Sequence, residues 1–562
     1  MPGRRRNLIP RMLDLKINLP HFGIAICTLI FLTACKGPHE QGVEYKKGKE
    51  LSYIQDQFEN HIPDYSTAGY KNGSPIPDVS TRLTLEPSTM DEDDTERIQQ
   101  AIDELSKLSP DAQGIRGAIL LKAGQYQVRG RLKISKSGVI LRGEGQFEDG
   151  TIIHATGMVR RSLITLNGID PEQEAYNQAA GGVFRYQPSS NSIWEIVDEY
   201  IPSGHSILQV APVSGLSVGD TIILEQRMNQ QWVTQLGMDN FPPRPDDQPS
   251  KPWDPPDFVF QFERTITKID GGRVHLNTAL VNPIFARFGE NRLFKPTLPE
   301  RIENSGVEHL RLISEFQNTE AANDENHAWD GVEVGLAQDC WIRGVSSIHF
   351  GQSTANVLPQ AIRITIEDCA FLDPIAREGY GRKHGFISAG QQILVQRALT
   401  EGCSFPFFIP GRTCGPNVFL DCYAKGEKSI IGPWRFWAMG TLWDNVHGNA
   451  LMIRNRGYEG NGWGWSGINH LFWNSTAFDW ISIQSPINGW NWSIGSQGRR
   501  IGGSFQGLTG HIIHHGKPRT PRSLYVEQLK DRKGAEATNG VISQNQESGT
   551  VFFHIRDTLG ER

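Results

Sequence analysis

The chain contains little cysteine and no long hydrophobic stretch. Seven cysteines occur in 562 residues, and none form a Cys-x-x-Cys pair, which excludes zinc and redox motifs built on that spacing. The apolar run of residues 22–34 is too short to span a membrane. Acidic residues outnumber basic ones, 62 to 56, so the composition argues against a nucleic-acid-binding protein.

The first 34 residues have the features of a signal peptide. Basic residues precede the apolar run, which ends in Leu32-Thr-Ala-Cys35. This ending resembles the lipobox of bacterial lipoprotein signal peptides. The resemblance implies cleavage before Cys35 and acylation of that cysteine, with an ordinary signal peptide as the alternative. We therefore expect a protein anchored by lipid to the bacterial outer membrane or cell surface, or to its periplasmic face.

Short apolar strands recur between Trp329 and Gly495, and each ends in a similar way. Their shared end position holds cysteine in four strands and asparagine in two: Cys340, Cys369, Cys403, Cys422, Asn445 and Asn474. Intervals of 19 to 34 residues between these positions predict a solenoid. Successive coils would then stack at about 4.8 Å, and we expect the six side chains near one corner.

Other segments flank or interrupt the repeats. Ile98, Ala101, Ile102 and Leu105 form one apolar stripe, which predicts a helix that caps the first coil. The hairpin signal Asp-Gly-Gly at 270–272 predicts antiparallel strands in an insertion. The predicted organisation is a signal peptide (1–34), a polar tether (35–60), an N-terminal cap with the first coils (61–157), a β insertion (158–300), the main coils (301–516), and a C-terminal helical cap with a polar tail containing one strand-like piece (517–562).

Three segments near the N-terminus carry a resemblance to a known family: Asp64-Tyr-Ser-Thr-Ala-Gly-Tyr70 with Ile76-Pro77, the predicted helix from Asp93 to Asp103, and the glycine-punctuated strands from Gly124 to Gly145. Together they resemble the start of the pectate lyase superfamily, and more narrowly its rhamnogalacturonase/epimerase-like pectate lyase domain. The resemblance implies an all-β fold, a right-handed parallel β-helix, that acts on polysaccharide. Since the superfamily contains lyases, hydrolases, epimerases and non-enzymatic phage fibres, it does not select a reaction. The calcium motifs of one pectate lyase branch and the motif set of polygalacturonase-type hydrolases are not found here.

An acidic cluster at 323–333 is the first candidate site. Carboxylates at close range can divide into an acid and a base, as glycosidases require, and Asp330 is the candidate for that role. Asp324 and Glu325 could instead hold Ca²⁺ through their oxygens, and His327 is a candidate substrate contact. A solvated turn is the alternative.

A basic, aromatic-edged groove is the second candidate. Elimination from a uronate needs a base, an acid and positive charge on the carboxylate. Tyr380 and His384 suit the proton transfers, with His384 expected on an exposed loop–strand junction. The charge role is predicted for Arg382, Arg412 and Arg435, and Lys383 in the same loop is a further catalytic candidate. Each arginine taken singly could equally be an ordinary surface residue.

Aromatic residues gather late in the chain. Nine of the fourteen tryptophans lie between 434 and 492. Trp434, Trp463 and Trp465 are predicted to stack on sugar rings, with Arg454 and Arg456 beside them as substrate contacts. The alternative is an aromatic stack inside the coil, where we place Trp443, Trp473 or both.

The preferred prediction is a monomeric enzyme that cleaves an acidic, uronic-acid-containing polysaccharide by β-elimination. A glycoside hydrolase that uses the 324–333 carboxylates is the second reading. The third is a non-catalytic glycan-binding protein. No cofactor is required by any of the three, although Ca²⁺ fits the acidic cluster.

Overall fold

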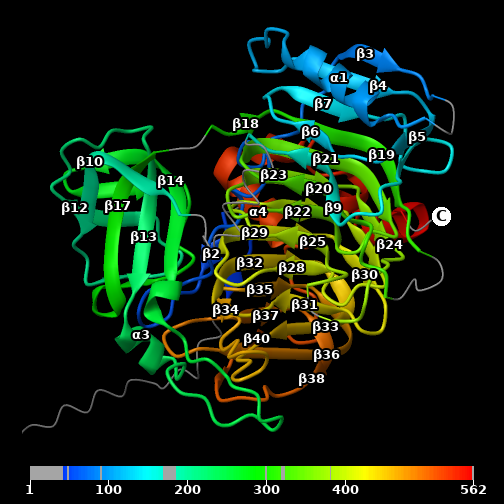
Figure 1. Ribbon diagram of the computed structural model, residues 1–562. Coiled ribbons are helices and arrows are strands. Elements are labelled where there is room, and N and C mark those ends of the chain that lie inside the picture. Colours follow the sequence, from blue (N-terminus) through cyan, green and yellow to red (C-terminus); the bar gives the residue numbers. More distant parts are fainter. Residues whose placement is uncertain are drawn as a thin grey trace, which may run out of the picture. The chain divides into compact units, whose positions relative to one another are not determined.

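The computed structural model describes residues 42–46, 48, 50–88, 92–168, 185–297, 300–317, 323–379 and 381–559. They form a right-handed parallel β-helix with an antiparallel insertion (Figure 1). Each full coil contributes one strand to each of three parallel sheets. The predicted all-β solenoid is confirmed.

The first sheet consists of β3 (Thr81–Leu85), β4 (Gly117–Leu121), β7 (Val139–Arg142), β18 (Ile302–Glu303), the first part of β19 (Gly306–Ser314), the first part of β21 (Ala337–Ile348), β23 (Ile362–Glu367), β26 (Leu394–Gln396), β29 (Cys414–Leu420), β32 (Ala438–Asp444), β34 (Gly467–Ile468), β35 (Leu471–Trp473), β37 (Trp492–Ile494) and β40 (His511–Ile513). The second consists of β5 (Gly124–Val128), β8 (Thr151–Ala155), the later parts of β19 and β21, β24 (Ala370–Leu372), β27 (Leu399–Glu401), β30 (Tyr423–Lys425), and the first parts of β33 (His447–Ile453), β36 (Thr476–Ser485) and β38 (Gln497–Arg500). The third consists of β6 (Leu132–Ile134), β9 (Arg161–Leu166), β20 (Ala328–Val334), β22 (Ser353–Val357), β25 (Gly385–Ser388), β28 (Phe407–Ile409), β31 (Ile430–Pro433) and the later parts of β33 and β36.

The interior of the coils is one apolar core that runs along the stack. Helix α1 (Thr95–Ser106) closes the first coils, and its predicted stripe is buried in that core. A helix at this end covers strand edges that would otherwise be open to pairing with another chain.

The corner between the first and second sheets corrects the predicted ladder. Five equivalent residues there have positive φ: Asp368, Arg397, Asp421, Asn445 and Asn474. The asparagines therefore stack with the aspartates that precede Cys369 and Cys422, one residue away from the cysteine column. The cause is the left-handed turn, which Asn and Asp tolerate best. Cys340 lies within its first-sheet strand, opposite Ile364, and Cys403 follows β27 of the second sheet, so the six side chains do not share a corner.

The insertion is a closed antiparallel barrel of six strands: β10 (Gln187–Ile196), β12 (Ile207–Ala211), β15 (Arg273–Leu276), β14 (Val259–Asp270), β13 (Thr221–Met228) and β17 (Gly289–Thr297). It also carries the pair β11 (Tyr200–Ile201) and β16 (Ile284–Phe285) and helix α3 (Gln230–Gln235). The predicted antiparallel insertion is confirmed, but residues 161–166 belong to the coils, because β9 pairs in parallel with β6 and β20.

The terminal segments cover the outer faces of two sheets. Val43, Leu51 and Tyr65 pack with helix α4 (Leu524–Lys533) on the first sheet, and β1 (Val43–Glu44) pairs with β2 (Ser52–Tyr53), so residues 42–60 are part of the fold instead of a tether. The end of the chain packs on the second sheet through α6 (Val551–His554), after α5 (Gln544–Ser548), so the predicted strand-like piece is helical. No helix among the described residues is long and apolar enough to cross a membrane. The described cysteines are all buried and free, as predicted.

Candidate active site on the third sheet

The outer face of the third sheet carries two carboxylates from one strand. A side chain on Gly331 would meet Ser347 and Leu312 in the interior, and Val332 is also in the core. Asp330 and Glu333 lie on either side of this inward pair in β20, and both face outward, next to a register irregularity in the pairing with β9. The strand thus presents two acids three residues apart to one surface.

Neighbouring coils hold these acids by hydrogen bonds. Ser353 Oγ lies 2.5 Å from Asp330 Oδ1, and Asn356 Nδ2 donates to Asp330 Oδ2 at 3.3 Å. On the other side, Ser162 Oγ donates to Glu333 Oε2 at 2.9 Å. Burial raises the pKa of Asp330 from 3.8 to about 7, and the negative charge of Glu333 acts in the same direction. Asp330 therefore remains largely protonated up to near-neutral pH, while only 6% of it is exposed.

The rest of the acidic cluster is held in ion pairs and backbone contacts. Glu325 binds Arg382 and Arg377, which holds its pKa at about 2. Asp324 accepts the backbone N–H groups of Gln317 and Asn326, both at 2.8 Å. These oxygens are not arranged as Ca²⁺ ligands, and no cluster of His, Cys, Asp and Glu in the described part of the chain fits a metal ion.

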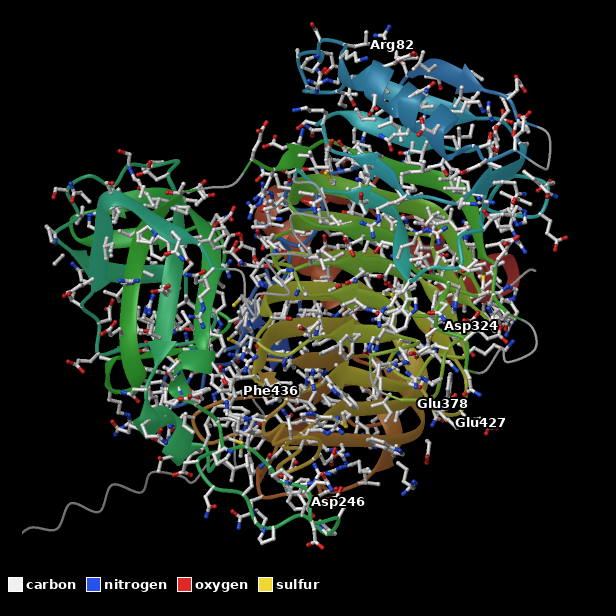
Figure 2. The ribbon with its side chains drawn as sticks, viewed as in Figure 1. Arg82, Asp246, Asp324, Glu378, Glu427 and Phe436 are labelled. Atoms are coloured by element: carbon white, nitrogen blue, oxygen red, sulfur yellow. The ribbon has the colours of Figure 1, made fainter. Side chains whose placement is uncertain are left out.

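His327 is also corrected as a substrate contact. Its side chain has no exposed surface and lies 3.7 Å from Asp324. The neighbouring Trp329 is sandwiched, with Arg160 at 3.3 Å from its ring centroid and Arg382 at 5.6 Å. This cluster forms one border of the candidate site, and Figure 2 shows Asp324 and Glu378 along this side of the coils, with Phe436 on the other.

His384 is buried, contrary to the exposed junction that the sequence predicted. Only 4% of the residue is exposed, and its ring stacks on Phe408 at 4.1 Å between centroids. Desolvation, with Arg435 as a second cause, lowers its pKa to about 3. The imidazole is therefore neutral near pH 7, mainly because it is buried. The neighbouring cations are paired, Arg382 with Glu325 and Lys383 with Glu378 at 3.1 Å. Those two cations are therefore not free to stabilise an intermediate.

Arg412 and Arg435 do come together, and the charge of Arg435 also acts on His384. Each is half-buried. Desolvation lowers the pKa of Arg412, the charge of Arg435 lowers it further, and the charge of Asp257 acts in the opposite direction. Arg412 reaches Asp257 only at 3.9 Å, and no carboxylate among the described residues forms an ion pair with Arg435. Both guanidinium groups lie over Phe436, at 5.0 and 5.2 Å from the ring centroid. With one carboxylate at 3.9 Å for two guanidinium groups, this pair keeps excess positive charge.

The predicted sugar-stacking tryptophans are buried. Trp434 and Trp463 enclose Arg456, whose guanidinium lies 3.8 and 4.5 Å from their ring centroids. Arg456 and Arg454 both pair with Glu459. Trp465 is 4% exposed and donates to Leu236 O in the insertion. The long loop of the insertion contacts the glycine-rich segment 457–464, and Trp463 within that segment is buried.

Comparisons with known proteins add no argument about the reaction. No family model and no curated protein matches the sequence. Similar solved structures include the tailspike gp61 of Pseudomonas phage phi297, at 10% identity and TM-score 0.38 over 75% of this chain and 59% of that chain. The polygalacturonase from Erwinia carotovora ssp. carotovora matches at 9% identity and TM-score 0.34 over 78% and 98%. Pectate lyase Pel9A matches at 12% and 0.24 over 40% and 67%. The chain thus spans less than two thirds of the tailspike, and none of the likenesses is close.

Several site residues were not found from the sequence alone. Ser162, Ser353 and Asn356 reach the carboxylates from other coils, and Ser162 lies 171 residues from Glu333. Only the coil register could have found them, because neither serine nor asparagine carries a local signal. Tyr380 and Cys35 lie outside the described residues.

Proposed function

We propose that the protein is a polysaccharide-degrading glycoside hydrolase whose catalytic pair is Asp330 and Glu333. The observation that carries the proposal is the Asp330 carboxyl group, whose pKa of about 7 keeps it largely protonated beside a second carboxylate on the same outer face. A carboxyl group whose environment keeps it protonated, beside a second carboxyl group, is the arrangement that glycoside hydrolysis uses.

In this mechanism, Asp330 donates its proton to the glycosidic oxygen as the bond to the anomeric carbon breaks. Glu333 acts from the same strand, either by taking a proton from the attacking water or by attacking the anomeric carbon itself. Ser162 orients Glu333, and Ser353 and Asn356 orient Asp330. Each group is fixed by a neighbouring coil, which favours the preorganisation on which catalysis depends.

An acidic polysaccharide is the proposed substrate class. Arg412 and Arg435 follow β28 and β31, which lie three and four strands along the third sheet from β20. At about 4.8 Å per strand, they lie roughly 15–20 Å along the sheet from the carboxylates. Arg435 forms no ion pair with a carboxylate of the described residues, and Arg412 reaches Asp257 only at 3.9 Å. Such guanidinium groups suit the carboxylate of a uronate residue at a distant subsite.

β-Elimination is the second candidate, and the position of His384 beside Arg435 favours it. In that reaction, a base removes the C5 proton, arginine charge stabilises the resulting anion, and the C4 oxygen leaves with a proton. A pKa of about 3 makes His384 a weak base, which is why we prefer hydrolysis.

Digestion of a panel of uronic-acid polysaccharides separates the candidates. Hydrolysis produces reducing ends without ultraviolet absorbance. Elimination produces a reducing end on one fragment and an unsaturated, absorbing uronate at the new non-reducing end of the other. Binding without either product would contradict both enzymatic readings and favour a glycan-binding protein.

We further propose that Cys35 anchors the mature protein to the bacterial outer membrane or cell surface. The support is the Leu-Thr-Ala-Cys ending of the apolar run. Cys35→Ala should move the protein from the detergent phase to the aqueous phase, and unchanged partitioning would contradict the anchor.

A further inference from the structure

A polar cleft of about 320 Å³ lies between the insertion and the coils, and neither Asp330 nor Glu333 is among its lining residues. Lys71 from the N-terminal segment, Arg264 and Asn277 from the insertion, and Arg363 from the coils are among its lining residues. The coil residues that line the cleft lie at the beginning of β21 and β23 in the first sheet. The cleft is therefore on a different face of the β-helix from the third-sheet site. Its size falls at the lower end of the range for small-ligand sites.

The two acids of the cleft are already neutralised. Glu263 receives two hydrogen bonds from Arg301, both at 2.8 Å. Asp339 receives two from Arg363, at 2.7 and 2.8 Å. Each carboxylate is therefore matched by its own arginine, and neither remains to balance another cation.

Arg264 has no such partner, although it is fully buried. Its Nη atoms donate to Glu263 O, Gly415 O and Gln391 Oε1 at 2.8 to 3.1 Å, and all three acceptors are uncharged. Its Nε has no hydrogen-bond partner in the described part of the chain, and only 1% of the residue is exposed. A buried charge without a counter-charge costs several kcal/mol in general, so a bound anion would stabilise this arrangement.

Lys71 adds a second cation at the mouth of the cleft. Its side chain is exposed, and no ion pair involving it occurs among the described residues. Three cations and two carboxylates line the cleft, and with Arg301, which pairs with Glu263 from outside the lining, the excess is two positive charges. The lining also carries amide groups suited to hydroxyls, such as Asn277. Charge focused in a concave site of this kind attracts anionic ligands.

We propose that this cleft is a second saccharide site, which binds a uronate residue of an acidic glycan through Arg264 and Lys71. The proposal rests on the acidic substrate of the proposed function but not on the chemistry of Asp330. One part of a glycan chain would be held in this cleft beside the insertion while another part of the same chain lies on the third sheet.

Titration calorimetry of the full chain with sodium glucuronate, and with glucose as the neutral control, tests the proposal. Lys71→Gln removes a charge from an exposed side chain. Asn277→Asp adds an opposing charge and retains an oxygen to accept the Thr265 N–H, as Asn277 Oδ1 does at 2.9 Å. Each variant should weaken glucuronate binding by about tenfold, the equivalent of one charge-assisted hydrogen bond. Lys268→Ala, which removes an exposed lysine elsewhere in the insertion, should leave binding unchanged.

Asp330→Asn should bind glucuronate as the unaltered protein does, so that failure of the hydrolase proposal and failure of this site are distinguishable. Arg435→Gln alters the third-sheet subsite. It should therefore leave intact the glucuronate binding that Lys71→Gln weakens. Unchanged glucuronate affinity in both Lys71→Gln and Asn277→Asp would overturn the proposal, as would equal affinity for glucose.

Discussion

The hydroxyl group of Ser353 lies 2.5 Å from Oδ1 of Asp330, so one coil holds the acid that the preceding coil presents. The pairing of β20 with β22 in the third sheet brings the two side chains together. The contact positions a carboxyl group that is protonated, whereas the nearby Glu325 is held in ion pairs. The predictions begin with this group.

Asp330→Asn should reduce turnover by roughly 10²- to 10⁴-fold, because the amide keeps the shape but cannot donate the proton. Glu333→Gln should give a loss of similar size. Reducing ends released from an acidic glycan measure both. Asp444→Asn is the matched control, since Asp444 is also buried with a pKa of about 7 but lies under α4, bonded to Ser523. Its loss of turnover should be less than tenfold; equal losses in all three variants would indicate damage to the fold.

The stability of the protein should depend on the protonation of Asp330. Its pKa is raised from 3.8 to about 7 on folding, so stabilisation is complete below about pH 4 and is lost as the pH rises through about 7. The slope is at most about 1.4 kcal/mol per pH unit for one such group. Denaturant midpoints at several pH values should show Asp330→Asn gaining stability relative to the unaltered protein across this window. A difference that does not change with pH would contradict the raised pKa.

His384→Ala should destabilise the protein by about 2–4 kcal/mol, as for other large buried side chains cut to alanine. The reason is the loss of its stacking on Phe408. At temperatures where the variant remains folded, turnover should stay within about tenfold of the unaltered enzyme. Circular dichroism and turnover on the same samples separate the two effects, and a fully stable variant with a loss above 10²-fold would favour elimination.

Arg435→Gln should raise KM for the acidic glycan more than it lowers kcat, because the guanidinium is proposed to hold a uronate away from the scissile bond. The effect should shrink as salt is added, since ionic contacts at a half-buried site are partly screened. Arg499→Gln is the control, as Arg499 is exposed and paired with Asp479. An equal rise in KM for both variants would contradict a specific subsite.

The fold could be predicted further than the site. The α1 stripe and the recurring strands follow periods that a single segment displays, so the capping helix and the coils were visible in the sequence. The alignment of asparagine with cysteine was wrong by one residue, because the left-handed corner that selects Asn445 and Asn474 is a backbone property. Such a property becomes clear only when the coils are placed in register.

The solvent exposure of the candidate site side chains was the feature least predictable from the sequence. Trp463 and Trp465 lie in a glycine-rich segment that looks exposed, yet a loop about 200 residues earlier in the chain covers it, with Trp253 Nε1 donating to Gly462 O. The burial of His384 against Phe408 also depends on a contact distant from its own segment, in this case between neighbouring coils. Asp330 was found because acids cluster locally, whereas its protonation depends on burial that no local pattern records.

The most direct test of the central proposal follows both products of glycan cleavage in one experiment. The unaltered protein, Asp330→Asn and Asp444→Asn are each incubated with the uronic-acid polysaccharides, and reducing ends and ultraviolet absorbance are recorded together. We predict new reducing ends without absorbance, lost in Asp330→Asn and retained in Asp444→Asn. Absorbance that rises with the reducing ends and persists in Asp330→Asn would contradict a hydrolase built on Asp330.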